Sequence, residues 1–183
     1  ASGGRIGPAD AIHAGFADYY IAQDKWPTLI ADLVQTGDWT AIDRAAGTPP
    51  AGELAAQQDE IDMLFAGDSL QDILNALQAS DSEFAAKALK TLNRVSPLSA
   101  ACTIELVHRA RASDDIHKAL EQEYRFTHRA MEQGDFLEGI RAQIIDKDRN
   151  PTWKHSRADG VTTMEVSQML LPLGADALRF EEE

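Results

Sequence analysis

The sequence predicts a mainly α protein with at most one short strand near the N-terminus. Apolar residues recur at positions i, i+3, i+4 and i+7 in several segments, which is the spacing that gives a helix one apolar face. Pairs of polar residues with capping-box spacing mark three helix starts. They are Ser69 with Asp72, Asp135 with Glu138, and Thr162 with Glu165. Only Ala17–Ile21 has the composition of a strand.

The first 24 residues are expected to form a helix followed by that strand. Pro8 suits the first turn of a helix, and Gly15 suits the position just past its last turn. A lone strand at Ala17–Ile21 needs partner strands, which the rest of the chain does not offer. We therefore expect residues 1–24 to be the remnant of a larger core and residues 25–183 to form a helical region.

Helices are expected almost throughout residues 25–183. Three apolar stripes are predicted to be core faces: Trp26, Leu29, Ile30 and Leu33; Leu70, Ile73, Leu74 and Leu77; and Val166, Met169, Leu170 and Leu173. Further helices are predicted at 53–66, 82–94, 97–112 and 114–133. Ser96 and Pro97 supply an N-cap and a first-turn proline, and Gly134 ends the last of these helices. Residues 48–52, Thr-Pro-Pro-Ala-Gly, form the clearest linker.

Composition limits the class of protein. A net charge of −13 argues against nucleic-acid binding, which needs a basic face. No apolar run reaches the roughly 20 residues of a membrane-spanning helix. The single cysteine, Cys102, cannot form an internal disulfide, and we expect it to be a small core residue in a reducing cytoplasm. The start, Ala1-Ser2-Gly3-Gly4, reads as a cut inside a longer protein.

The sequence holds no local catalytic or metal-binding motif. Its five histidines lack HxxxH and HExxH spacing, and no GxSxG, GxxxxGK[ST] or GxGxxG segment occurs. Residues 146–150, Asp-Lys-Asp-Arg-Asn, begin like a calcium loop, but Pro151 replaces the required glycine and Arg157 replaces the bidentate glutamate. We expect no cofactor and no metal.

Several segments together resemble one enzyme family. The stretch QGDFLEGIRAQIIDKDRNPTW, residues 133–153, resembles the C-terminal signature of the 3-hydroxyisobutyryl-CoA hydrolase branch of the crotonase (enoyl-CoA hydratase/isomerase) superfamily. Residues 96–99 resemble its SPLS segment, and residues 4–18 resemble its G-R-L-x-G-x-D-A…A-G-L-A-D segment. The helical insert at about 25–95 and the IDKD-x-x-P-x-W form favour the hydrolase branch over plain enoyl-CoA hydratases.

The resemblance implies the helical C-terminal region of a crotonase-type protein, with residues 1–24 as the remnant of the crotonase core. The oxyanion hole and acidic pair of such an enzyme would precede Ala1, so no catalytic residue is assigned here. The implied function is part of a CoA-thioester hydrolase of valine breakdown, inactive alone. The alternatives are the C-terminal part of an enoyl-CoA hydratase/isomerase and an autonomous helical interaction module. Implied partners are an acyl-CoA substrate, the upstream core and a second copy of the chain.

One basic turn is a candidate binding site for the phosphates of CoA. Positive charge is concentrated in residues 87–157, which hold 13 Lys and Arg against 10 Asp and Glu. Lys147, Arg149 and Lys154 lie there on a turn next to Trp153, and a turn can aim several cations at one phosphate. The structural alternative is that these side chains are solvated and pair with Asp146 and Asp148.

Overall fold

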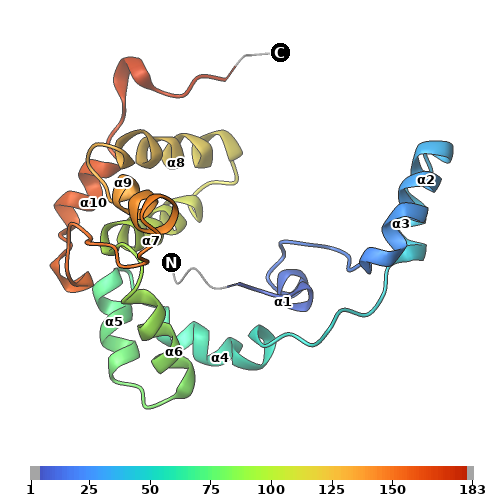
Figure 1. Ribbon diagram of the computed structural model, residues 1–183, viewed down its shortest axis with the longest axis horizontal. Coiled ribbons are helices and arrows are strands. Elements are labelled where there is room, and N and C mark those ends of the chain that lie inside the picture. Colours follow the sequence, from blue (N-terminus) through green and yellow to red (C-terminus); the bar gives the residue numbers. More distant parts are fainter. Residues whose placement is uncertain (1–4, 181–183) are drawn as a thin grey trace. The chain divides into compact units, whose positions relative to one another are not determined.

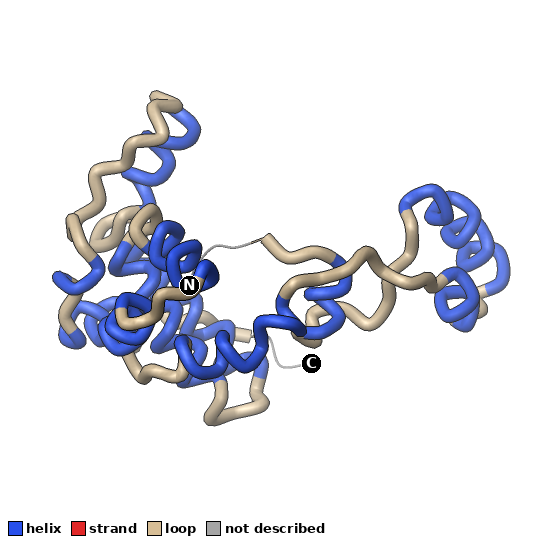
Figure 2. Tube along the Cα trace, turned by 90° about the horizontal axis from the view of Figure 1, so that it is seen from below, coloured by secondary structure: helices blue, strands red, loops and turns tan. Residues whose placement is uncertain are grey.

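The computed structural model describes residues 5–180, and it is mainly helical, as the sequence predicts (Figure 1). Its α-helices are α1 Pro8–His13, α2 Trp26–Thr36, α3 Thr40–Ala45, α4 Leu54–Leu64, α5 Leu70–Gln78, α6 Glu83–Leu92, α7 Pro97–Ala110, α8 Ile116–Ala130, α9 Phe136–Ile140 and α10 Thr163–Met169. A π turn at Arg141–Ile145 continues α9. Three single 3-10 turns lie at Gln23–Lys25, Ala158–Gly160 and Gly174–Asp176. Figure 2 shows helices joined by loops, and residues 5–180 include no strand.

The chain divides into two compact units, Gly4–Met63 and a larger unit that begins at Leu64. This division reflects contacts within the folded chain. The boundary expected between residues 24 and 25 separates a remnant of the upstream core from the helical region. That boundary stays a prediction. The expectation about the start of the chain falls on Ala1–Gly4, which lie outside the described residues.

The first unit begins with α1, bracketed by Pro8 and Gly15 as predicted. Pro8 stands in the first turn, and Gly15 has a φ of 75°, a left-handed conformation that favours glycine. The buried carboxylate of Asp10 accepts a hydrogen bond of 2.9 Å from the backbone N–H of Leu54. This bond satisfies an amide at the start of α4 and so ties α1 to α4.

The strand expected at Ala17–Ile21 is not formed. The carbonyl of Tyr20 accepts a bond of 2.9 Å from the N–H of Gly47, and the carbonyl of Ile21 accepts one of 2.9 Å from the indole N–H of Trp26. A strand needs a ladder of backbone partners on a neighbouring strand, and residues 5–180 offer none. The segment is therefore a loop whose carbonyls bind nearby groups.

The apolar stripe of α2 was expected to be a core face, and that expectation is wrong for Trp26 and Ile30. Both are exposed, Val34 on the next turn is 83% exposed, and no residue of α2 is buried. Within its unit α2 packs mainly on the short helix α3 and on the turn at Gln23–Lys25. So few neighbours leave most of the apolar face uncovered.

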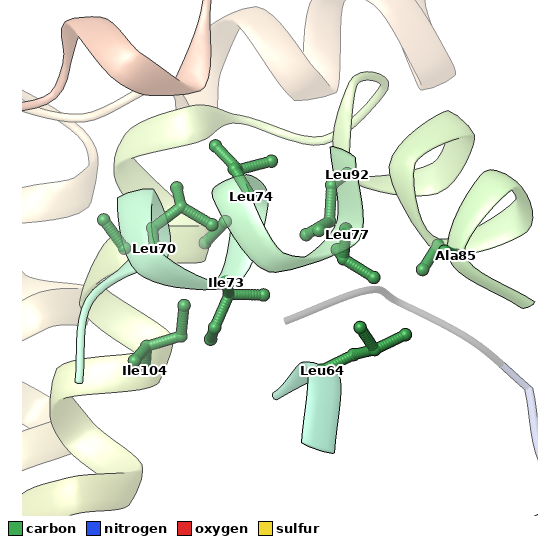
Figure 3. Close-up of a cluster of buried hydrophobic side chains, with 11 residues drawn as sticks. Leu64, Leu70, Ile73, Leu74, Leu77, Ala85, Leu92 and Ile104 are labelled. Carbon is green, nitrogen blue, oxygen red and sulfur yellow. The ribbon is translucent and has the colours of Figure 1, made fainter. Parts of the chain in front are cut away.

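The second unit contains the hydrophobic core. The stripe predicted on α5 is fully buried there and packs on α6 and α7 (Figure 3). A second cluster joins Leu98 and Cys102 of α7 to Met169 and Leu170 at the end of α10. Cys102 is a buried core residue, as expected, and burial raises the pKa of its thiol to about 12. The α10 helix ends at Met169, so Leu173, which was predicted to belong to its apolar stripe, lies outside the helix.

Helix caps explain where several helices begin. The capping boxes predicted at Ser69 with Asp72 and at Thr162 with Glu165 are both present. Ser96 caps α7 by accepting a bond of 3.2 Å from the N–H of Ser99. The box predicted at Asp135 with Glu138 is wrong, because both carboxylates bind groups outside α9 (below).

One arginine closes the end of α10. The guanidinium of Arg129 donates hydrogen bonds to the carbonyls of Met169, Leu171 and Pro172, at 3.1, 2.7 and 3.3 Å. Carbonyls at the end of a helix lack partners within the helix, so a cation from α8 satisfies them. No helix of residues 5–180 has the length and apolar character needed to cross a membrane.

Candidate functional site

The candidate site is the turn at residues 146–154, which follows the π turn at the end of α9. The turn is organised around the side chain of Arg141, which lies just before it in the π turn. Nε and Nη2 donate bonds of 2.9 and 2.8 Å to the two carboxylate oxygens of Glu138. Nη1 donates bonds of 2.7 Å to Asp146 and to Asp148, and Nη2 donates one of 3.2 Å to the carbonyl of Asn150. A guanidinium has five N–H donors, so Glu138 and the turn together use every donor of Arg141.

The same contacts shift the pKa values of the carboxylates. Hydrogen bonds from Arg141, and then from the N–H of Thr152, hold the pKa of Glu138 at about 2, below its ordinary value of 4.5. Arg141 and the N–H of Asn150 lower the pKa of Asp148, and the surrounding carboxylates raise the pKa of Arg141. At neutral pH Glu138, Asp148 and Arg141 are therefore charged.

The backbone of the turn is unusual at the two predicted cations. Lys147 has a φ of 57° and Arg149 a φ of 55°, in the left-handed region that residues with a Cβ seldom occupy. Neighbouring bonds fix this path. The N–H of Arg149 donates to the carbonyl of Ala142 at 3.0 Å, and the N–H of Asn150 donates to the carboxylate of Asp148 at 2.9 Å.

The far end of the turn is attached to the core through Asp135. One carboxylate oxygen accepts a bond of 2.8 Å from the N–H of Lys154, and the other accepts one of 2.5 Å from the hydroxyl of Ser96. Asp135 and Ser96 are each 7% exposed. The indole N–H of Trp153 donates to the carbonyl of Arg94 at 3.2 Å. The position of Lys154 is thus set by the start of α7.

The structure places Lys147, Arg149 and Lys154 on this one turn, and all three are exposed. The side chains of Lys147 and Arg149 form no hydrogen bond or ion pair with any described residue, and Nζ of Lys154 donates a bond of 3.4 Å to the carbonyl of Gln133. The alternative pairing with Asp146 and Asp148 is not found, because those carboxylates bind Arg141.

The organisation of the turn was missed by the sequence analysis. Arg141 was not singled out, and Glu138 was interpreted only as part of a capping box. Their i, i+3 spacing, with Glu138 first, was the available signal. Asp135 was interpreted as a helix cap, so its partner Ser96, 39 residues earlier, carried no local signal.

A hollow of about 400 Å³ lies beside the turn. It is lined by Trp153, Ser156 and Arg157 from the loop, and by Gln71 and Asn93 from the region of α5 and α6. Arg157 is paired with Asp159 at 2.7 Å. Within the part of the chain that the structure describes, this site included, no group of three His, Cys, Asp or Glu side chains is placed to hold a metal ion.

Comparison with known proteins finds relatives that match nearly the full length of the chain. The pattern of the enoyl-CoA hydratase/isomerase family matches residues 1–170. A mitochondrial 3-hydroxyisobutyryl-CoA hydrolase of Xenopus laevis is 30% identical and covers 97% of this chain, and the human protein of the same name is 28% identical and covers 98%. The chain spans about half the length of these relatives, 49% in each case.

Two solved structures share the fold of this chain. An enoyl-CoA hydratase from Rhodobacter sphaeroides 2.4.1 is 50% identical, covers 98% of this chain and 52% of its own, and superposes with a TM-score of 0.90. A carnitinyl-CoA dehydratase from Mycobacterium thermoresistibile is 34% identical, covers 100% and 52%, and also has a TM-score of 0.90. The resemblance seen in the sequence is confirmed, and the chain belongs to the enoyl-CoA hydratase/isomerase family of the crotonase superfamily.

Proposed function

We propose that this chain is the helical C-terminal part of a CoA-thioester hydrolase that acts on 3-hydroxyisobutyryl-CoA in valine breakdown. The observation that carries the proposal is the similarity of 97% of the chain to proteins named 3-hydroxyisobutyryl-CoA hydrolase. The whole protein would hydrolyse a thioester, so that water adds to the carbonyl carbon and the sulfur leaves as the thiol of CoA. The chain alone is proposed to be inactive, because none of its residues is matched to an oxyanion donor or to a catalytic acid.

A second candidate is a hydratase of the same superfamily. The solved relatives of 50% and 34% identity bear the names of an enoyl-CoA hydratase and a carnitinyl-CoA dehydratase. A hydratase adds water across a carbon–carbon double bond and leaves the thioester intact. The third candidate, an autonomous helical interaction module, would show neither activity.

One pair of assays separates these functions. The full-length protein is incubated with 3-hydroxyisobutyryl-CoA and a thiol reagent, and separately with an enoyl-CoA whose absorbance reports the double bond. Release of free thiol supports the hydrolase, whereas loss of the double bond without thiol release supports the hydratase. The 183-residue chain is assayed in parallel, and turnover near a typical enzyme rate of about 10 per second would overturn its proposed inactivity.

We propose that Lys147, Arg149 and Lys154 bind the phosphates of the CoA moiety. Their support is the exposure of all three on one turn and the lack of an ion pair at Lys147 and Arg149 within residues 5–180. Replacing the three by glutamine should raise the KM for the acyl-CoA with little change in kcat, because remote contacts are lost equally from the ground and transition states. The control replaces Lys90, Arg111 and Arg179, exposed cations outside the turn, by glutamine. An unchanged KM in the first variant would reject the site.

The proposed protein partners are an upstream core and a second copy of the chain. Their support is the uncovered apolar face of α2, where Trp26, Ile30 and Val34 are exposed. Light scattering over a concentration series, with Ile30→Lys/Val34→Lys as the comparison, tests self-association. A monomeric chain at all concentrations would exclude the second copy.

We propose that the protein is located in the cytoplasm, although the vertebrate relatives are named mitochondrial. Cell fractionation decides between the cytoplasm and the mitochondrion.

A further inference from the structure

The charge pattern of the turn poses a problem for anion binding. Lys147 lies between Asp146 and Asp148, and Arg149 directly follows Asp148. An exposed cation beside a carboxylate tends to pair with it, and a paired cation attracts a phosphate less strongly. A working phosphate site at this turn requires something to keep the carboxylates away from the cations.

Arg141 does this in the structure. Both Asp146 and Asp148 direct an oxygen to its Nη1 at 2.7 Å, while Nε and Nη2 are anchored on Glu138. The two carboxylates are therefore held at one guanidinium, apart from the cations of the turn. The guanidinium itself has no donor left for a ligand.

The backbone keeps this separation in place. Lys147 and Arg149, two residues apart, both adopt left-handed conformations. Residues hold such sparsely populated conformations only where the surroundings fix them, and such positions are common at binding sites. Here the surroundings are the bonds of Arg141 to both aspartates and to the carbonyl of Asn150.

We propose that Arg141 is a positioning residue of the phosphate site: it holds Asp146 and Asp148 so that Lys147 and Arg149 remain available to an anion. The inference rests on the function proposed above for these cations. Arg141 does not touch the ligand. Its contribution to binding comes from removing competing carboxylates and from fixing the path of the turn.

The test is a double-mutant cycle on binding of CoA to the full-length protein. The four proteins are the native one, Arg141→Gln, Asp146→Asn/Asp148→Asn, and the combination of all three changes. Isothermal calorimetry measures Kd for CoA and for 3′-dephospho-CoA, which lacks one phosphate. Arg141→Gln should raise the Kd for CoA roughly three- to fivefold, the scale of an exposed ion pair. In the background without the two carboxylates the same change should raise it less than about twofold.

A matched control separates a local effect from a general loss of charge. Arg44→Gln removes another exposed arginine that is paired with an aspartate, Asp38, in the first unit of the chain. It should leave the Kd unchanged. Circular dichroism and thermal unfolding of all variants verify that the helices are intact, so that a change in Kd is a property of the turn.

Each outcome decides between the proposals. A loss of affinity in Arg141→Gln that largely disappears in the combined variant supports the positioning role. An equal loss in both backgrounds, or no loss at all, overturns it. If the Lys147, Arg149 and Lys154 triple variant also binds CoA normally, the phosphate site itself fails. If that triple variant loses affinity while Arg141→Gln does not, the site stands and only the role of Arg141 falls.

Discussion

The hydroxyl of Ser96 donates a hydrogen bond of 2.5 Å to the carboxylate of Asp135, and both side chains are buried. The same hydroxyl oxygen accepts the bond that caps α7, while the second oxygen of Asp135 accepts the N–H of Lys154. Two side chains thus connect the start of α7, the start of α9 and the candidate turn.

Asp135→Ala should lower the free energy of unfolding by about 1–3 kcal/mol, because the Ser96 hydroxyl and the Lys154 N–H lose their acceptor. Urea unfolding followed by circular dichroism measures the change. Asp176→Ala, at an exposed aspartate, is the control and should have little effect. Equal stability of the two variants would contradict the connecting role of Asp135.

Arg129→Met should lower the free energy of unfolding by about 1–2 kcal/mol, since the carbonyls of Met169 and Leu171 lose a charged donor. Amide exchange in α10 should become faster, because the end of the helix is no longer fixed. Arg111→Met removes an exposed arginine near the end of α7 and should leave exchange in α10 unchanged. Unaltered exchange in Arg129→Met would show that other groups close this helix.

Glu138 should titrate near pH 2 in the folded protein, whereas its ordinary pKa is 4.5. A carboxyl with a lowered folded pKa stabilises the protein above its unfolded pKa, and this contribution is lost as the pH falls from about 4.5 through about 2. Carboxyl NMR shifts followed against pH measure the value. In Arg141→Gln the pKa of Glu138 should move back towards 4.5, while Glu165, held at about 2 chiefly by Thr162, should not change. A Glu138 pKa that is unaffected by the substitution would argue against the Arg141 contacts.

Cys102 should react slowly with alkylating reagents in the folded protein. Its side chain is fully buried and its pKa is about 12, so the reactive thiolate is scarce at pH 8. Mass spectrometry after timed treatment with iodoacetamide, with and without urea, compares the two states. Rapid labelling without urea would show that the helices around Cys102 open readily.

Local patterns were sufficient to predict the elements that pack within the chain. The apolar stripe of α5 and the capping box at Ser69 depend only on nearby residues, and both are present. The same reasoning failed at Ala17–Ile21 and on the apolar face of α2. A strand or an apolar stripe is stable only against a partner, and its own residues do not show whether the chain contains that partner. The cations of the turn were visible in the sequence. Their separation from Asp146 and Asp148 was not, because it depends on the direction in which Arg141 points.

The π turn at Arg141–Ile145 implies that this site depends on chain length as well as on residue type. The bond from the N–H of Asp146 to the carbonyl of Arg141, at 2.8 Å, spans five residues where an α-helix would span four. If the same residues were wound as an ordinary α-helix, Ile145 would take the place of Asp146 at that carbonyl, and everything after it would rotate by about 100° around the helix axis. Asp146 and Asp148 would then face away from Arg141 although no charged residue had changed. When relatives are compared at this turn, the first question is therefore whether each has the same number of residues in the π turn. The identity of the side chains comes second.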